Sequence, residues 1–313
     1  MILSLEQIES VLFGFVELSQ NEKGIRGYKC TKPVIDAWYA QQVDLGQRAE
    51  TSTGIRLDFH TDATAVRFTV ANGPFNLLVD GLYTQTYPVK EKPEDISLPL
   101  DGNEHRVTLI FPSHSVGGSV LGMELSDGAS LTPHQYDEKF LFLGDSITQG
   151  WNSGTDCLSY AWRTSLFFNA DCRIHGVGGG YFHPTVFEGR DFDPDRVFVA
   201  FGTNDFGKNK TLDDLRANAA AYLDQVADAF PGKKIYGITP IWRNDTWEKP
   251  MGTFDQCREV IREEHEKRGF TVIDGMTLVP HNMEFFSDTI HPNALGFSMY
   301  AQNLIKAILA AEK

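Results

Sequence analysis

Short runs in the first part of the chain alternate hydrophobic and polar residues. Such alternation places one face of each run against a core and the other in water, as in antiparallel β-strands. Turn-forming residues such as Asp80-Gly81 separate the runs. We expect strands at residues 55–60, 65–70, 75–79 and 105–111, whereas residues 5–18 fit either a helix or an extended segment. Short, regularly spaced strands predict an antiparallel, jelly-roll-like β-sandwich over residues 1–135.

The pattern changes near residue 139, where hydrophobic runs begin to alternate with segments of helical periodicity. The expected strands are residues 139–143, 172–176, 197–201, 234–238 and 271–274, and the expected helices are residues 211–230, 254–268 and 294–311. Thr211 and Asp214 have the spacing of a capping box at the start of the first helix. Alternating strands and helices predict a second domain, residues 136–313, with a parallel sheet covered by helices on both faces.

Chemically informative residues follow four of the five expected strands of this second domain. The first strand ends in Gly144-Asp145-Ser146, a glycine-rich run at 176–180 follows the second, and Gly202-Thr203-Asn204 follows the third. Asp288 and His291 lie in the loop after the fifth strand. Because the carboxyl ends of parallel strands meet at one edge, we expect these groups to converge. A serine beside an imidazole that is oriented by a carboxylate predicts nucleophilic acyl transfer.

These four segments together resemble the motifs of the GDSL esterases and lipases, also called SGNH hydrolases, over the second part of the chain. The resemblance implies a flavodoxin-like three-layer α/β/α fold. It also implies that Ser146 is the nucleophile, His291 the general base and Asp288 the residue that orients the base. The backbone N–H of Ser146, the N–H of a glycine in the second segment and the side-chain amide of Asn204 would form the oxyanion hole. No cofactor or metal is implied.

The second segment departs from the family pattern, which has a single glycine before a polar residue. Here Gly178, Gly179 and Gly180 follow one another. The spacing from Gly176 favours Gly179 as the oxyanion donor, with Gly178 as the alternative. Thr148 occupies the position of the second glycine in a Gly-x-Ser-x-Gly motif, so the chain lacks the nucleophile elbow of α/β-hydrolases.

Composition narrows the classes of partner. The net charge of −14 disfavours binding to nucleic acids and anionic membranes. The four cysteines form no CxxC pair, which disfavours a zinc or redox site. We expect no membrane span and no secretory signal, and therefore a cytoplasmic location. The sequence does not predict the oligomeric state.

Aromatic residues suggest the substrate side of the site. Trp151, Tyr181 and Trp242 follow strand ends, where they could stack on a sugar or line an acyl pocket, although such residues also fill cores. A β-sandwich ahead of the hydrolase domain resembles the arrangement in acetyl-xylan-type carbohydrate esterases. We therefore expect hydrolysis of small acyl esters, above all O-acetyl groups on a carbohydrate. The alternatives are a lysophospholipase or thioesterase, and a carbohydrate-binding protein with a lapsed catalytic site.

Overall fold

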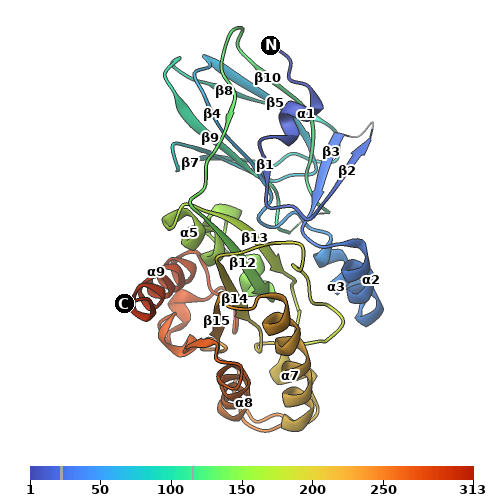
Figure 1. Cartoon of the computed structure of the whole chain (residues 1–313), viewed down its shortest axis with the longest axis vertical. Helices are drawn as coiled ribbons and strands as arrows, with labels where there is room; N and C mark the ends of the chain where they lie inside the picture. Colours follow the sequence, from blue (N-terminus) through green and yellow to red (C-terminus); the bar gives the residue numbers. More distant parts are fainter. Residues whose placement is uncertain (22–23, 115) are drawn as a thin grey trace.

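The computed structural model describes residues 1–21, 24–114 and 116–313 (Figure 1). A β-sandwich lies at one end, and an α/β part that contains the carboxyl terminus lies at the other. None of the helices in the described ranges is long and apolar enough to cross a membrane.

Two antiparallel sheets form the sandwich. The first contains, in spatial order, β1 (Leu12–Phe13), β4 (Arg56–Thr61), β9 (His105–Ile110), β6 (Phe75–Val79) and β7 (Leu82–Tyr87), with β11 (Thr132–Pro133) paired to β4. The second contains β2 (Glu17–Asn21), β3 (Gly24–Tyr28), β10 (Ser119–Leu125), β5 (Ala65–Ala71) and β8 (Glu94–Pro99). The four strands expected here match β4, β5, β6 and β9, and the antiparallel β-rich part is confirmed.

Alternation explains the sandwich core. Along β5, Val66, Phe68 and Val70 are fully buried, while Ala65 and Arg67 are exposed. The rings of Phe68 and Phe59, from opposite sheets, meet edge to face at 6.3 Å. The segment that fitted two structures contains both, because α1 (Leu5–Glu9) precedes β1 and the start of β2.

A five-stranded parallel sheet forms the centre of the α/β part. Its strands, in spatial order, are β13 (Ala170–Gly176), β12 (Glu138–Gly144), β14 (Arg196–Ala200), β15 (Lys234–Ile238) and β16 (Thr271–Ile273). Numbered along the chain, this order is 2-1-3-4-5, the flavodoxin-like order, which confirms the expected fold class. The order reverses between β12 and β14, and such switch points are where open α/β sheets bind ligands.

Helices cover both faces of this sheet. In β12, Leu141 and Leu143 pack toward α7 (Leu212–Ala229) and α8 (Phe254–Glu266). Phe140 and Phe142 pack toward α5 (Tyr160–Phe167) and α9 (Ala294–Ala311). Helix α7 begins with the predicted capping box between Thr211 and Asp214. Shorter elements complete this part: α4 (Ser146–Gln149), α6 (Asp205–Lys208), η1 (Asp156–Leu158), η2 (Gly275–Thr277) and η3 (Met283–Phe285).

Two helices in the first 135 residues were not predicted. They are α2 (Lys32–Gln41) and α3 (Val43–Ala49), and Figure 1 shows them, in blue, next to the α/β part. Trp38 and Leu45 are each 2% exposed and belong to the same hydrophobic cluster as Leu143 and Val177. Residues 1–135 therefore form more than a sandwich. We propose a domain division after residue 135, with α2 and α3 as an extension of the first domain onto the core of the second.

Candidate active site

Ser146 lies where β12 turns into α4. Asp145 caps this short helix, because its Oδ1 accepts a hydrogen bond of 2.9 Å from the N–H of Ile147. A Cβ on Gly144 would lie 2.1 Å from Thr148 Oγ1, so only glycine fits at this turn. The N–H of Ser146 belongs to the first turn of α4, where backbone donors have no intrahelical acceptor.

Ser146, His291 and Asp288 are joined by two successive hydrogen bonds. Ser146 Oγ lies 2.8 Å from His291 Nε2, and His291 Nδ1 lies 2.8 Å from Asp288 Oδ2. The other carboxylate oxygen, Asp288 Oδ1, accepts bonds from the backbone N–H groups of Ile290 and His291. Burial alone would raise the pKa of Asp288, but these bonds and the His291 ring outweigh it and lower the pKa. The carboxylate is therefore held ionised against the imidazole.

The glycine run forms a loop after β13 whose three N–H groups differ in their partners. The N–H of Gly178 donates to Gln149 Oε1 at 2.6 Å, and the N–H of Gly180 donates to Val177 O at 2.7 Å. The N–H of Gly179 donates to no atom within the ranges described, and its φ of +81° favours glycine. Of the two predicted donors, Gly179 is thus the one whose N–H is available.

Asn204 lies against the same loop. Its Nδ2 donates to the carbonyl oxygen of Gly180 at 2.9 Å, which fixes the amide and leaves its second N–H for another acceptor. The next residue, Asp205, is fully buried and accepts from the N–H of Phe182 at 3.2 Å. Burial raises the pKa of Asp205 to about 7. The loops after β13 and β14 are therefore joined by polar bonds at the carboxyl edge of the sheet.

The three predicted substrate aromatics separate into two groups. The ring of Trp151 lies 6.4 Å from the His291 ring and 4.9 Å from the His114 ring. Tyr181 packs on Trp38 and donates to Gln41, both in α2. Trp242 stacks on His281 at 5.9 Å and contacts Phe286. Among the described residues, Trp151 is the member of the three that contacts the Ser146–His291 pair.

Sequence reasoning missed polar residues that surround the glycine loop. Arg48 Nη1 donates to Gly178 O at 3.0 Å, and its guanidinium lies 5.5 Å from the centre of the Trp151 ring. Gln149, within the Ser146 segment, bonds the N–H of Gly178. The position of Gln149 in the motif could have drawn attention to it. Nothing in the sequence connects Arg48 with a loop 130 residues away.

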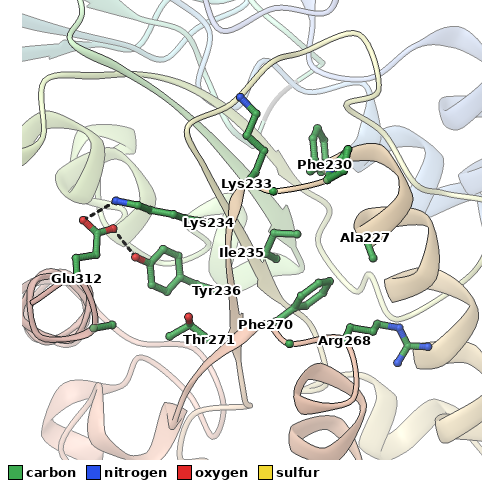
Figure 2. Close-up of a pocket in the computed structure, with 14 residues that line it drawn as sticks. Ala227, Phe230, Lys233, Lys234, Ile235, Tyr236, Arg268, Phe270, Thr271 and Glu312 are labelled. Atoms are coloured by element: carbon green, nitrogen blue, oxygen red, sulfur yellow. Dashed lines mark hydrogen bonds and ion pairs between the residues drawn. The ribbon is translucent and has the colours of Figure 1, made fainter.

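Other parts of the molecule offer less chemistry. Within the described ranges, no three His, Cys, Asp or Glu side chains are placed to hold a metal ion. A cleft of about 460 Å³, shown in Figure 2, lies where β15 and β16 begin, at the edge of the sheet opposite Ser146. Glu312 accepts from Tyr236 at 2.5 Å and pairs with Lys234 at 3.1 Å there (Figure 2), so these three polar side chains of the cleft are bonded to one another.

Comparison with known proteins identifies the family. Residues 142–298 match the model of the GDSL-like lipase/acylhydrolase family, which is half of the chain. The chain belongs to this family. The GDSL-like match begins inside β12 and ends inside α9, so it contains Ser146, the glycine loop, Asn204, Asp288 and His291. Comparison with curated protein sequences found no match.

Solved structures share the fold of this GDSL-like protein over almost its whole length. A salicylyl-acyltransferase, SsfX3, from a tetracycline biosynthetic pathway has 17% identity and a TM-score of 0.84, covering 96% of this chain and 94% of its own. A putative GDSL-like lipase from Bacteroides ovatus has 16% identity and a TM-score of 0.77, covering 99% and 97%. A family two carbohydrate esterase from Clostridium thermocellum, in complex with cellohexaose, has 16% identity and a TM-score of 0.73, covering 96% and 99%.

Proposed function

We propose that this GDSL-like acylhydrolase is a serine esterase that cleaves small acyl esters through Ser146, His291 and Asp288. The observation that carries the proposal is the pair of 2.8 Å contacts that joins serine hydroxyl, imidazole and carboxylate in sequence. A serine hydroxyl is a weak nucleophile until a base accepts its proton, and His291 Nε2 is within reach of that proton.

The reaction proceeds in two displacements. Ser146 Oγ attacks the acyl carbonyl while His291 accepts its proton, and the imidazolium then protonates the leaving alcohol, which leaves an acyl-enzyme. Water attacks the acyl carbon in the same way, gives its proton to His291 and releases the acid as Ser146 recovers its hydrogen. In both steps the N–H groups of Ser146 and Gly179 and the amide of Asn204 stabilise the negative oxygen.

The substrate that we propose is an O-acetyl group on a carbohydrate. Two observations support it. A family two carbohydrate esterase that binds cellohexaose has the same sandwich and α/β arrangement along 96% of this chain. Trp151 lies beside His291, where a flat aromatic ring can pack against a sugar. Tyr181 and Trp242 fit this role less well, because among the described residues the ring of Tyr181 contacts Trp38, and that of Trp242 contacts His281 and Phe286, rather than His291.

The test combines an acyl-length series with acetylated saccharides. We expect faster hydrolysis of nitrophenyl acetate than of octanoate, release of acetate from acetylated oligosaccharides, and loss of turnover by roughly 10⁶ in Ser146→Ala with unchanged thermal stability. Full activity of Ser146→Ala would refute the nucleophile. A preference for octanoate, lysophospholipid or acyl thioester would favour the lysophospholipase or thioesterase alternative. Saturable glycan binding without ester turnover would indicate a lapsed site. Addition of an alcohol as acyl acceptor distinguishes hydrolysis from acyl transfer, because hydrolysis releases the free acid whereas acyl transfer forms a new ester.

A further inference from the structure

Two side chains from residues 1–135 donate hydrogen bonds to the glycine loop of the candidate site, residues 176–180. Lys29 Nζ donates to Gly176 O at 2.6 Å, and Arg48 Nη1 donates to Gly178 O at 3.0 Å. Lys29 follows β3, and Arg48 lies in α3. Two of the carbonyl groups that set the path of the loop are therefore held by side chains from outside the α/β part.

Gln149 links this support to the nucleophile. It is 1% exposed and lies in α4, three residues after Ser146. Its Oε1 accepts from the N–H of Gly178 at 2.6 Å, while its Nε2 donates to Ser113 O and to Thr51 Oγ1, the latter at 3.3 Å. One carboxamide thus joins the nucleophile helix, the glycine loop and the first 135 residues.

Thr51 contacts both Lys29 and Gln149. Its Oγ1 lies 2.7 Å from Lys29 Nζ and 3.1 Å from Thr53 Oγ1, and Thr53 Oγ1 lies 3.0 Å from the same ammonium. Lys29 therefore has three acceptors, namely Gly176 O and the two hydroxyls, which match its three N–H donors.

Burial of Lys29 lowers the stability of the fold, so packing alone does not explain a lysine at this position. Lys29 is fully buried, and no carboxylate in the described part of the chain forms an ion pair with it. Burial lowers the pKa of Lys29 to about 7. A buried ammonium without a counter-ion destabilises a fold, and a methionine of similar length would fill the space without that cost. The directed bonds of Lys29 are what an apolar side chain could not supply.

We propose that Thr51 and Gln149, together with Lys29, are positioning residues of the oxyanion loop. They hold the N–H of Gly178 against Gln149, so that the next N–H in the loop, that of Gly179, is presented to the reacting oxygen. The inference rests on the proposed function. Because an oxyanion exists only beyond the ground state, misplacing this donor lowers kcat while KM changes little.

The test replaces Thr51 by valine, which keeps the shape of the side chain and removes the hydroxyl. We expect Thr51→Val to lower kcat for nitrophenyl acetate by roughly tenfold, less than the loss of an entire oxyanion donor, with KM within about twofold. Thr51→Ser, which keeps the hydroxyl, should restore most of that loss. Thr108→Val is the matched control, because Thr108 is also buried and hydroxyl-bonded, to Asp58 within the sandwich. This control should change thermal stability but not kcat.

A second measurement separates failure of the inference from failure of the proposed function. A fluorophosphonate that labels Ser146 develops a negative oxygen in the same position, whatever the natural ester is. Labelling of wild type with about tenfold slower labelling of Thr51→Val supports the inference. Equal labelling rates for wild type and Thr51→Val would overturn the inference, as would an equal loss of labelling rate in Thr51→Ser and Thr51→Val. Either result would leave the assignment of Ser146 as the nucleophile intact. If wild type is not labelled at Ser146, the proposed function fails and the inference fails with it.

Discussion

Asp288 decides whether the site works as a triad or as a Ser–His pair. Its Oδ2 contacts His291 Nδ1 at 2.8 Å, yet its side chain is 45% exposed. A carboxylate this exposed to water could contribute little to catalysis. Asp288→Asn is an informative change because the new amide oxygen can still accept from the N–H groups of Ile290 and His291. The amide nitrogen would face His291 Nδ1, which would place the ring proton on Nε2, facing Ser146.

The size of the effect follows from the charge that develops on His291. An imidazolium and a carboxylate whose charge centres are about 4 Å apart attract by about 4 kcal/mol at an effective dielectric constant of about 20. Exposure of Asp288 to water screens this attraction, and we reduce it by half, to about 2 kcal/mol. That energy corresponds to a loss of roughly 30-fold in kcat for Asp288→Ala. Asp288→Asn should lose more, because it also stabilises the wrong tautomer, but less than the ~10⁴-fold measured for a buried triad carboxylate in another hydrolase.

The assay is the steady-state hydrolysis of nitrophenyl acetate by wild type, Asp288→Ala and Asp288→Asn, with thermal stability measured in parallel. Asp101→Asn is the matched control, because Asp101 bonds the ring of His105 at 2.9 Å in the sandwich, away from Ser146. The control should keep the wild-type kcat. If Asp288→Asn stays within about threefold of wild type, the carboxylate contributes no more than an exposed ion pair, and His291 acts on Ser146 alone.

Two further predictions concern the neighbouring loops. Asn204→Ala should lower kcat by roughly 100- to 1,000-fold with little change in KM, as expected for the loss of an oxyanion donor, and a change confined to KM would contradict that role. Burial raises the pKa of Asp145 from 3.8 to about 7, so the folded state binds a proton that the unfolded state releases between these values. Unfolding free energy should therefore fall as pH rises from about 4 to 7, by up to about 4 kcal/mol from this group. In denaturant titrations, Asp145→Asn should remove the part of this slope that Asp145 contributes and leave the part from Asp205, whose pKa is also raised to about 7, and an unchanged slope would assign the proton to another group.

Local patterns predicted the elements whose cores are formed by neighbouring segments. Strands β4, β5, β6 and β9 each have one face on the sandwich core, so alternation located them closely. The helices α2 and α3 were missed although a signal was present. Pro33 in the first turn and the spacing of Val34 and Trp38 are both typical of a helix. The apolar side chains of α2 and α3 are buried against residues such as Val177 in the other half of the chain. A pattern read over a short window of sequence cannot include such distant residues.

The same difference governs what the sequence revealed of the site. Ser146, Asn204, Asp288 and His291 could be proposed as site residues because reactive side chains follow strands, and the topology of a parallel sheet gathers strand ends at one edge. Lys29 and Arg48 could not, because they act on the backbone carbonyls of Gly176 and Gly178, and a carbonyl is present at every residue. Side chains that support a loop through its backbone leave no pattern in either partner. The contribution of the first 135 residues to the site therefore becomes visible only in three dimensions, where α3 and the segment after β3 lie against the glycine loop.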